Sequence, residues 1–179
     1  FPQFDKFIEQ TKDVWTHLVD IRKSFEPRAE ELAKKYALAP YTMFIGSGAL
    51  WGETILFSMC ILEEMQWKRT RYITSADFFH GTLELVEPGV PVFLFMGEDE
   101  NRKLDERVRA FLTRGVTGDT DINIIDTAEF AIPGLDDEFR VIVSPWILTV
   151  LVTDRLARYY ETVTKHNLKY RRYYHQFDY

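Results

Sequence analysis

Three side chains between Thr42 and His80 have the types needed for proton transfer. Two adjacent glutamates, Glu63 and Glu64, end a long apolar helix-like segment, and His80 follows the next strand-like segment. A histidine exchanges protons near neutral pH, and a glutamate does so when burial raises its pKa. The carboxylate and the imidazole are therefore candidates for one pocket with acid–base chemistry. In an arbitrary sequence, exposed glutamates at a fraying helix end and a structural histidine are the more common situation.

The apolar spacing does not decide which glutamate points inward. Glu63 continues the helical row that contains Met59, and Glu64 continues the row that contains Cys60. The segment is apolar on nearly all sides, which is typical of a helix buried in a core or in a subunit interface. Both glutamates therefore remain candidates on spacing alone.

A glycine turn precedes this helix. Gly46-Ser47-Gly48 allows a sharp turn and brings a helix N-terminus close to the end of a strand, a place that suits an anion. The turn lacks the third glycine of a dinucleotide fingerprint and the Gly-Lys-Ser/Thr of a P-loop, so both of those readings are excluded. A tight turn without a ligand explains the pattern equally well.

The elements that must position these residues alternate between strands and helices. Apolar runs predict strands over 41–45, 71–74, 90–96 and 122–126, and residues 141–143 form either a fifth strand or the start of a helix. Helices are predicted over 49–67 and 104–114. This alternation predicts a parallel sheet with helices on both faces. Ligands of such sheets bind beyond the carboxyl ends of the strands, where 46–48, Ser75 and 97–101 would lie.

The two ends of the chain are expected to pack against something. Periodic apolar residues predict a helix over 4–22, a break over 24–27, and a second helix over 27–36 that begins at Pro27. The tail over 165–179 mixes cations with rings, including Tyr170, Tyr173, Tyr174 and Phe177. A docking segment is the simpler interpretation of this tail, and a cation placed near a site is the alternative.

Composition limits the class of protein. The 179 residues are 46% hydrophobic, which favours one domain with a sizeable core. A net charge of −6 argues against nucleic-acid binding. No window has the length of a membrane span, and no signal-peptide pattern opens the chain. Cys60 is the only cysteine, so we expect a reducing, cytoplasmic compartment. The chain lacks an initiator Met, so we expect a piece of a longer protein.

The order of these motifs resembles a known family. The strand, Gly46-Ser47-Gly48, the apolar helix that ends at 63–67, and the segment 75–81 are similar to the second SIS (sugar isomerase) half of fructosamine-6-phosphate deglycases. Residues 167–174 resemble the arginine- and tyrosine-rich end of that family. A more distant similarity is to the isomerase domain of glucosamine-6-phosphate synthase, where a Glu and the His of a His-Gly pair lie sixteen positions apart. The same interval here, 80 minus 64, selects Glu64 over Glu63.

The resemblance implies a fold and an assembly. It implies a flavodoxin-like three-layer sandwich with a five-stranded parallel sheet, in which residues 1–40 are linking helices, 41–165 the second SIS half and 166–179 the tail. The first half would supply the loops that hold the sugar phosphate. The active sites would form where the subunits of a homo-oligomer meet.

The resemblance also implies roles for residues. Glu64 would be the general base at the C1/C2 carbons of an open-chain ketosamine, and His80 would assist ring opening or protonate the leaving amine. Possible substrate contacts are Gly46, Ser47, Gly48, Ser75, Arg171 and Arg172. The implied function is a deglycase that releases a hexose 6-phosphate and an amine without a metal or an organic cofactor. An aldose-ketose isomerase and a non-catalytic sugar-phosphate-binding module are the alternatives.

Overall fold

A parallel sheet forms the centre of the molecule. In the computed structural model, which describes residues 3–115, 118 and 120–178, its strands are β1 (Thr42–Gly46), β2 (Thr70–Ile73), β3 (Val92–Met96) and β4 (Ile122–Asp126). The order across the sheet is β2, β1, β3, β4, and all neighbours are parallel. Residues 1, 2 and 179 of the predicted terminal segments lie outside the described residues.

The central strands divide their side chains between two hydrophobic cores. Phe44 of β1 and Phe93 of β3 belong to the first core, with ring centroids 5.2 Å apart. Met43 and Leu94 belong to the second. Every residue of β1 and β3 is buried. Continuous apolar runs are typical of parallel strands that helices cover on both faces, and the prediction of such strands is confirmed.

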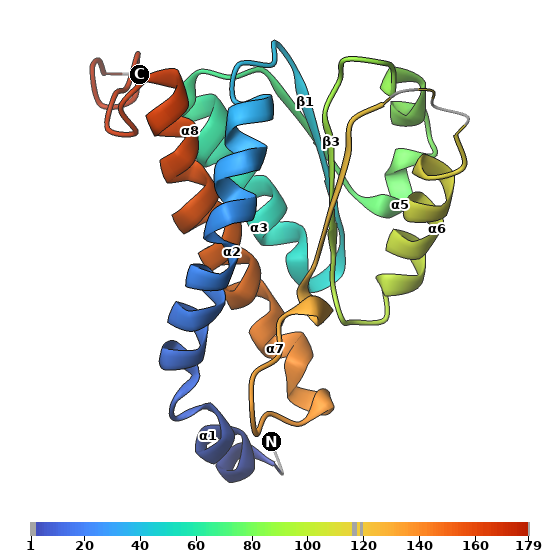
Figure 1. Ribbon diagram of the computed structural model, residues 1–179, viewed down its shortest axis with the longest axis vertical. Helices are drawn as coiled ribbons and strands as arrows, with labels where there is room; N and C mark the ends of the chain where they lie inside the picture. Colours follow the sequence, from blue (N-terminus) through green and yellow to red (C-terminus); the bar gives the residue numbers. More distant parts are fainter. Residues whose placement is uncertain (1–2, 116–117, 119, 179) are drawn as a thin grey trace.

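Helices cover both faces of the sheet (Figure 1). The first core joins the sheet to α2 (Val14–Tyr36), α7 (Asp137–Leu148), η5 (Thr149–Leu156) and α8 (Ala157–Thr164), and to the run after β1 made of η1 (Gly48–Leu50), α3 (Trp51–Ile55), η2 (Leu56–Glu63) and α4 (Glu64–Gln66). The second core joins it to α5 (Ser75–Phe78) and α6 (Arg102–Leu112). The remaining short elements are α1 (Phe4–Thr11), η3 (Thr82–Leu85) and η4 (Thr127–Glu129). The predicted three-layer α/β architecture is confirmed.

The predicted fifth strand is wrong, because residues 141–143 lie inside α7. Phe139, Val143 and Ile147 are buried at intervals of four residues, and Ile142 is exposed. This spacing places the buried side chains on one face of a helix, where Val143 and Ile147 join the first core. The sheet that the described residues form therefore has four strands.

The predicted helix break at 24–27 is also wrong. The chain breaks earlier, between α1 and α2, and α2 continues through Pro27. A proline inside a helix costs about 3 kcal/mol because it removes a backbone hydrogen bond and crowds the preceding turn. The buried stripe of α2 extends on both sides of Pro27, through Phe25 and Ala29, so packing of the helix offsets this cost.

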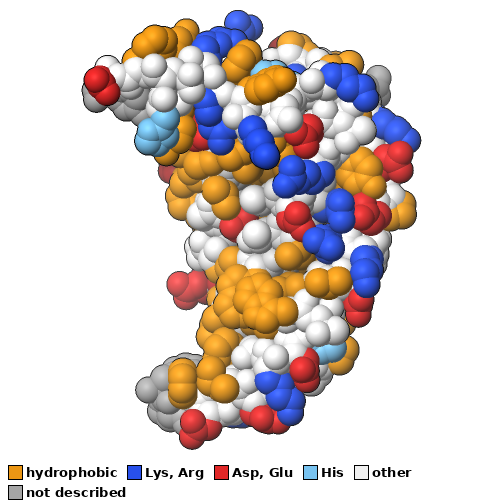
Figure 2. Space-filling model, turned by 90° about the vertical axis from the view of Figure 1, so that its left-hand side faces the viewer, with side chains coloured by type: hydrophobic (Ala, Val, Ile, Leu, Met, Phe, Trp, Pro, Cys, Tyr) orange, Lys and Arg blue, Asp and Glu red, His pale blue; other side chains and the backbone are white. Residues whose placement is uncertain are grey.

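The surface includes a hollow with many apolar side chains. Figure 2 shows hydrophobic side chains gathered along one hollowed long side of the molecule. Exposed apolar residues of the first two helices include Ile8, Trp15 and Val19. Trp15 is 66% exposed, and its ring stacks on that of Trp146 with the ring centroids 5.7 Å apart. None of the helices in the described part of the chain is long and apolar enough to cross a membrane.

Candidate functional site

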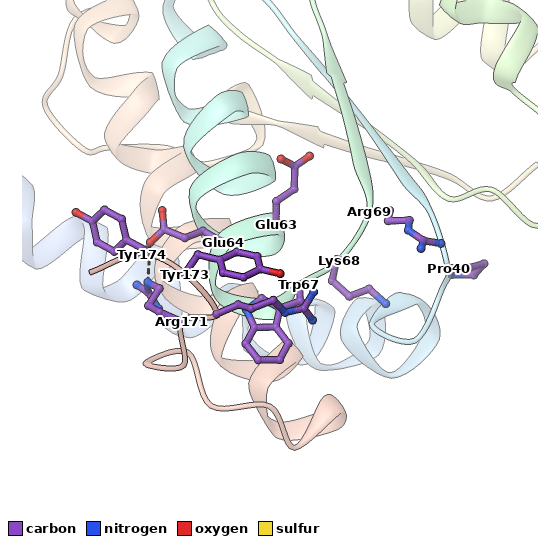
Figure 3. A pocket seen from close by; sticks show the side chains of 10 residues that line it. Pro40, Glu63, Glu64, Trp67, Lys68, Arg69, Arg171, Tyr173 and Tyr174 are labelled. Carbon is purple, nitrogen blue, oxygen red and sulfur yellow. Dashed lines mark ion pairs between the residues drawn. The ribbon is translucent and has the colours of Figure 1, made fainter. Parts of the chain in front are cut away.

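A pocket lies at the amino ends of the strands, where β1 and β2 begin. Its volume is about 610 Å³, and it is lined by Pro40, which precedes β1, by Lys68 and Arg69, which precede β2, and by the end of the helical run after β1. The tail forms the remaining wall (Figure 3). The complete lining is Pro40, Glu63, Glu64, Trp67, Lys68, Arg69, Arg171, Arg172, Tyr173 and Tyr174.

Glu64 faces this pocket beside a tail arginine. The Nε atom of Arg171 lies 2.7 Å from Oε1 of Glu64, and about a third of the glutamate side chain remains exposed. The N–H is not aligned for a hydrogen bond, so the contact is an ion pair. Arg171 itself is held by two bonds from Nη1, to the carbonyl oxygens of Leu168 and Tyr170 at 2.8 and 2.9 Å. The structure therefore brings together two of the predicted site residues that lie more than 100 positions apart.

The neighbouring glutamate has a structural partner. Oε1 of Glu63 accepts a hydrogen bond of 2.5 Å from the hydroxyl of Thr70, the first residue of β2. The Thr70 hydroxyl accepts in turn from Ser58 at 2.7 Å. This chain of bonds ties η2 to β2, and it leaves Glu64 as the glutamate without such a tie.

The tail reaches the pocket because several bonds fix its start. The side chain of Gln66 donates to the backbone oxygen of His166 at 2.5 Å and accepts from the hydroxyl of Thr164 at 2.7 Å. The backbone N–H of Leu168 donates to Glu161 at 2.9 Å. The His166 ring packs edge-on against Trp67, with centroids 4.3 Å apart. These contacts place the residues after α8 over the end of α4.

Three further cations stand around the pocket. The guanidinium of Arg172 lies 4.3 Å from the ring centroid of Trp67, a cation–π contact. The amine of Lys68 donates to the carbonyl oxygen of Ala39 at 2.7 Å, and partial burial lowers its pKa. Arg69 is exposed at the rim. Sequence reasoning missed Lys68 and Arg69, because loop residues carry no periodic signal.

The predicted contacts of the glycine turn lie at the carboxyl ends of the strands, opposite the end at which the pocket lies. Ser47 and Ser75 are 5% and 1% exposed, and the hydroxyl of Ser47 accepts from the backbone N–H of Ser75 at 2.7 Å. Ser75 donates to Asp105 at 2.5 Å, and Asp105 also accepts from the N–H of Gly97 at 3.3 Å. Burial raises the pKa of Asp105 to about 6. This network holds the strand ends together, and substrate contact by the two serines stays a prediction.

Steric contacts explain why glycine occupies both positions of the turn. Gly48 has a φ of +55°, and a Cβ atom there would lie 2.1 Å from a carboxylate oxygen of Asp99. A Cβ on Gly46 would lie 2.2 Å from the hydroxyl of Thr54. Packing therefore favours glycine at position 46, and packing together with backbone conformation favours it at position 48, whatever the turn binds.

His80 lies apart from Glu64. It is exposed in the turn after α5, where its backbone N–H donates to the carbonyl oxygen of Asp77 at 2.9 Å. α5 packs on the second core, whereas the helical run that ends in Glu64 packs on the first. The two predicted catalytic residues are thus on opposite faces of the sheet, and one copy of this chain does not bring them together.

The described residues offer acid–base and anion-binding groups rather than a metal site. Among residues 3–115, 118 and 120–178, no group of three or more His, Cys, Asp or Glu side chains is arranged to hold a metal ion. A carboxylate and several cations in one pocket suit proton transfer to an anionic substrate.

The fold is the SIS fold seen in solved proteins described as phosphosugar isomerases. A proposed phosphosugar isomerase from Bacillus subtilis superposes on 99% of this chain with a TM-score of 0.90 and 26% identity, over 53% of its own length. The C-terminal domain of glucosamine-fructose-6-phosphate aminotransferase from Francisella tularensis shares the fold, with a TM-score of 0.65 and 14% identity over 93% of this chain and 47% of that one.

The more particular similarity is to deglycases. Fructosamine deglycase FrlB of Bacillus subtilis is 28% identical over 174 residues, which are 96% of this chain and 51% of the relative. Fructoselysine 6-phosphate deglycase of Escherichia coli is 29% identical over 170 residues, 93% of this chain and 46% of the relative. These matches confirm the resemblance found in the sequence. The chain spans about half the length of the curated relatives it matches. No model of a known protein family matches it.

Proposed function

We propose that the protein containing this chain is a sugar-phosphate deglycase. It would cleave a 6-phosphorylated fructosamine or glucosamine-type conjugate of an amino acid to a hexose 6-phosphate and an amine. The observation that carries this proposal is the ion pair of Glu64 with Arg171 in an open pocket. The names of the relatives supply the substrate class.

The chemistry requires a base near C1 and C2 of the open-chain ketosamine. Glu64 would remove a proton from C1 while the C2 carbonyl oxygen gains one, which gives an enaminol. Return of a proton to C2, with loss of the N–H proton, would then leave an imine between C1 and the amine nitrogen. Water would then hydrolyse the imine to the aldehyde form of the hexose 6-phosphate and the free amine. Proton transfer by a positioned side chain contributes about 10²- to 10⁴-fold to such a rate. Arg171 would orient the Glu64 carboxylate through their ion pair.

An aldose-ketose isomerase is the second candidate. Its reaction needs the same proton transfer between C1 and C2 and releases no amine. The structural similarity to a proposed phosphosugar isomerase favours this candidate. The two reactions differ in one product, the amine, so product analysis separates them.

His80 enters this mechanism only from a second copy of this chain. Because Glu64 and His80 lie on opposite faces of one sheet, we propose a homo-oligomer, a dimer or larger, in which the site forms at a subunit interface. His80 of one protomer would then face Glu64 of its partner. The apolar side chains exposed on the hollowed side offer a surface for such an assembly.

The direct test measures hexose 6-phosphate and amine released from a phosphorylated fructosamine by the full-length protein. We expect Glu64→Gln to lower the rate at least about 100-fold and His80→Ala about 10- to 1000-fold, because each removes a proton-transfer group. Glu84→Gln, an exposed glutamate on η3, is the matched control.

Three other results would change the proposal. Isomerisation of a hexose 6-phosphate without amine release would establish the isomerase. A sugar phosphate that raises the melting temperature without turnover would indicate a binding module. Full activity of a folded Glu64→Gln variant would refute the role of Glu64.

A further inference from the structure

The tail reaches Glu64 with little apolar packing of its own. The rings of Tyr170, Tyr173 and Phe177 belong to residues that are 56%, 64% and 66% exposed. Leu168 packs against the first core, and it is only partly buried. The place of Arg171 beside Glu64 therefore depends on the hydrogen bonds that hold the start of the tail (Figure 3).

Gln66 is at the centre of these bonds. It is 5% exposed, and its amide joins two groups that follow α8: it donates to the carbonyl oxygen of His166 at 2.5 Å and accepts from the hydroxyl of Thr164 at 2.7 Å. The Thr164 oxygen also accepts from the backbone N–H of His166 at 3.2 Å. Both backbone polar groups of His166 are thus bonded within this cluster.

The path of the chain between α8 and His166 needs such support. Lys165 ends α8 in the left-handed conformation, with φ of 58°. This conformation costs free energy in a residue with a Cβ atom. Bonds to the residue that follows therefore stabilise the reversal that sends the tail back over α4.

A compact turn connects His166 to Arg171, five positions later. The side-chain oxygen of Asn167 accepts from the N–H of Lys169 at 2.8 Å, and its backbone oxygen accepts from the N–H of Tyr170 at 3.0 Å. The guanidinium of Arg171 bonds back to the carbonyl oxygen of Tyr170 at 2.9 Å. A fixed His166 therefore fixes the place from which Arg171 extends to Glu64.

We propose that Gln66 is a positioning residue for the proposed base: by holding His166, it keeps Arg171 paired with Glu64. This inference rests on the proposed deglycase function. Gln66 does not line the pocket. It follows Glu64 by two residues, and side chains two positions apart on a helix do not face each other. Gln66 therefore acts on Glu64 through the tail.

The first test measures amine release from fructoselysine 6-phosphate by the full-length protein. Gln66→Met keeps a side chain of similar length and removes the amide, and we expect kcat to fall about 10- to 100-fold because the base loses its orientation. Arg171→Gln should lower kcat by a similar factor. The double variant should lose no more than either single variant, because both substitutions break the same connection.

The second test follows the tail without using activity. Amide hydrogen exchange of residues 166–171 should be faster in Gln66→Met than in the wild type, and close to the wild-type rate in Arg171→Gln. Gln66→Glu is a second variant in case Gln66→Met does not fold, because an ionised carboxylate still accepts from Thr164 and cannot donate to His166.

Ser144→Ala is the matched control. Ser144 is also buried, and its hydroxyl donates within α7 to the carbonyl oxygen of Val141 at 3.3 Å, away from the pocket and the tail. This substitution should leave both kcat and tail exchange unchanged.

The outcomes separate this inference from the proposed function. Equal kcat losses in the two single variants and the double variant, with faster tail exchange in Gln66→Met, support the positioning role. An unchanged kcat in a folded Gln66→Met variant, or losses that multiply in the double variant, would overturn it and leave the deglycase standing. If the wild type releases no amine, the proposed function fails and the positioning role fails with it, and the exchange data still show whether Gln66 holds the tail.

Discussion

Asp105 joins three segments at the carboxyl edge of the sheet. It lies on α6 and is 1% exposed. Its two oxygens accept hydrogen bonds from the hydroxyl of Ser75 and from the backbone N–H of Gly97. No arginine or lysine pairs with it in the described residues, and Arg102 of the same helix pairs with Asp126 instead. Burial without a cation favours the protonated acid and raises its pKa to about 6.

We therefore expect Asp105 to weaken the fold as pH rises from about 4 to about 6. The folded state binds this proton more tightly than the unfolded state, so the free energy of unfolding falls with pH across that window. A pKa of about 6 against 3.8 corresponds to about 3 kcal/mol above that window. Urea denaturation at pH 4 and pH 7 should show that Asp105→Asn loses less stability than the wild type over this range.

The control for this prediction is Asp5→Asn, which changes an exposed aspartate of α1. Its pH dependence should follow the wild type. An Asp105→Asn variant whose stability falls with pH as steeply as that of the wild type would show that Asp105 does not carry the dependence.

Single residues of the pocket were only partly predictable from the sequence. Glu64 was selected by its sixteen-residue interval to His80, an interval taken from the resemblance. The tail arginines were named, but their contact with Glu64 depends on bonds such as that between Gln66 and His166. Such bonds join residues 100 positions apart, and no local pattern predicts them.

At the scale of elements, α2 is a helix that continues through a proline because of its packing. Pro27 is exposed in the middle of this helix and cannot donate to the carbonyl of Lys23. We expect Pro27→Ala to raise the free energy of unfolding by about 1–3 kcal/mol, because it restores that bond. The gain is reduced because proline also restricts the unfolded chain. The midpoint of urea denaturation measures it.

Glu31→Ala provides the comparison on the same helix, since Glu31 is exposed and its loss should change stability by less than about 0.5 kcal/mol. Destabilisation by Pro27→Ala would show that the bend or the ring of the proline itself contributes to packing.

Elements with a strong period or a continuous apolar run were predicted well. The runs of β1 and β3 left few alternatives, because strands buried on both faces need such runs. Residues 141–143 were left open between a strand and a helix, because three apolar residues fit a strand and a buried helix equally, and only the residues before and after them decide. The break before Pro27 failed because local propensity is weaker than the packing of a stripe that runs the length of α2.

At the scale of the whole molecule, the predicted site residues fall into three separate places. Glu64 and Arg171 share the pocket at the strand beginnings, Ser47 and Ser75 lie at the strand ends, and His80 lies on the other face. A strand of five residues spans about 16 Å, so groups at its two ends cannot act on one carbon atom. A site that uses Glu64 with His80 needs two copies of this chain.

Subunit complementation tests this arrangement directly. Glu64→Gln subunits lack the base, and His80→Ala subunits lack the imidazole, so each pure variant should keep at most about a tenth of the wild-type activity. In a mixed dimer with shared sites, one site contains both substitutions and the other contains neither. Random exchange of equal amounts makes half of the dimers mixed, so about a quarter of the wild-type activity should return. Activity that does not rise after exchange, with mixed dimers isolated through two different tags, would place the action of both residues within one subunit.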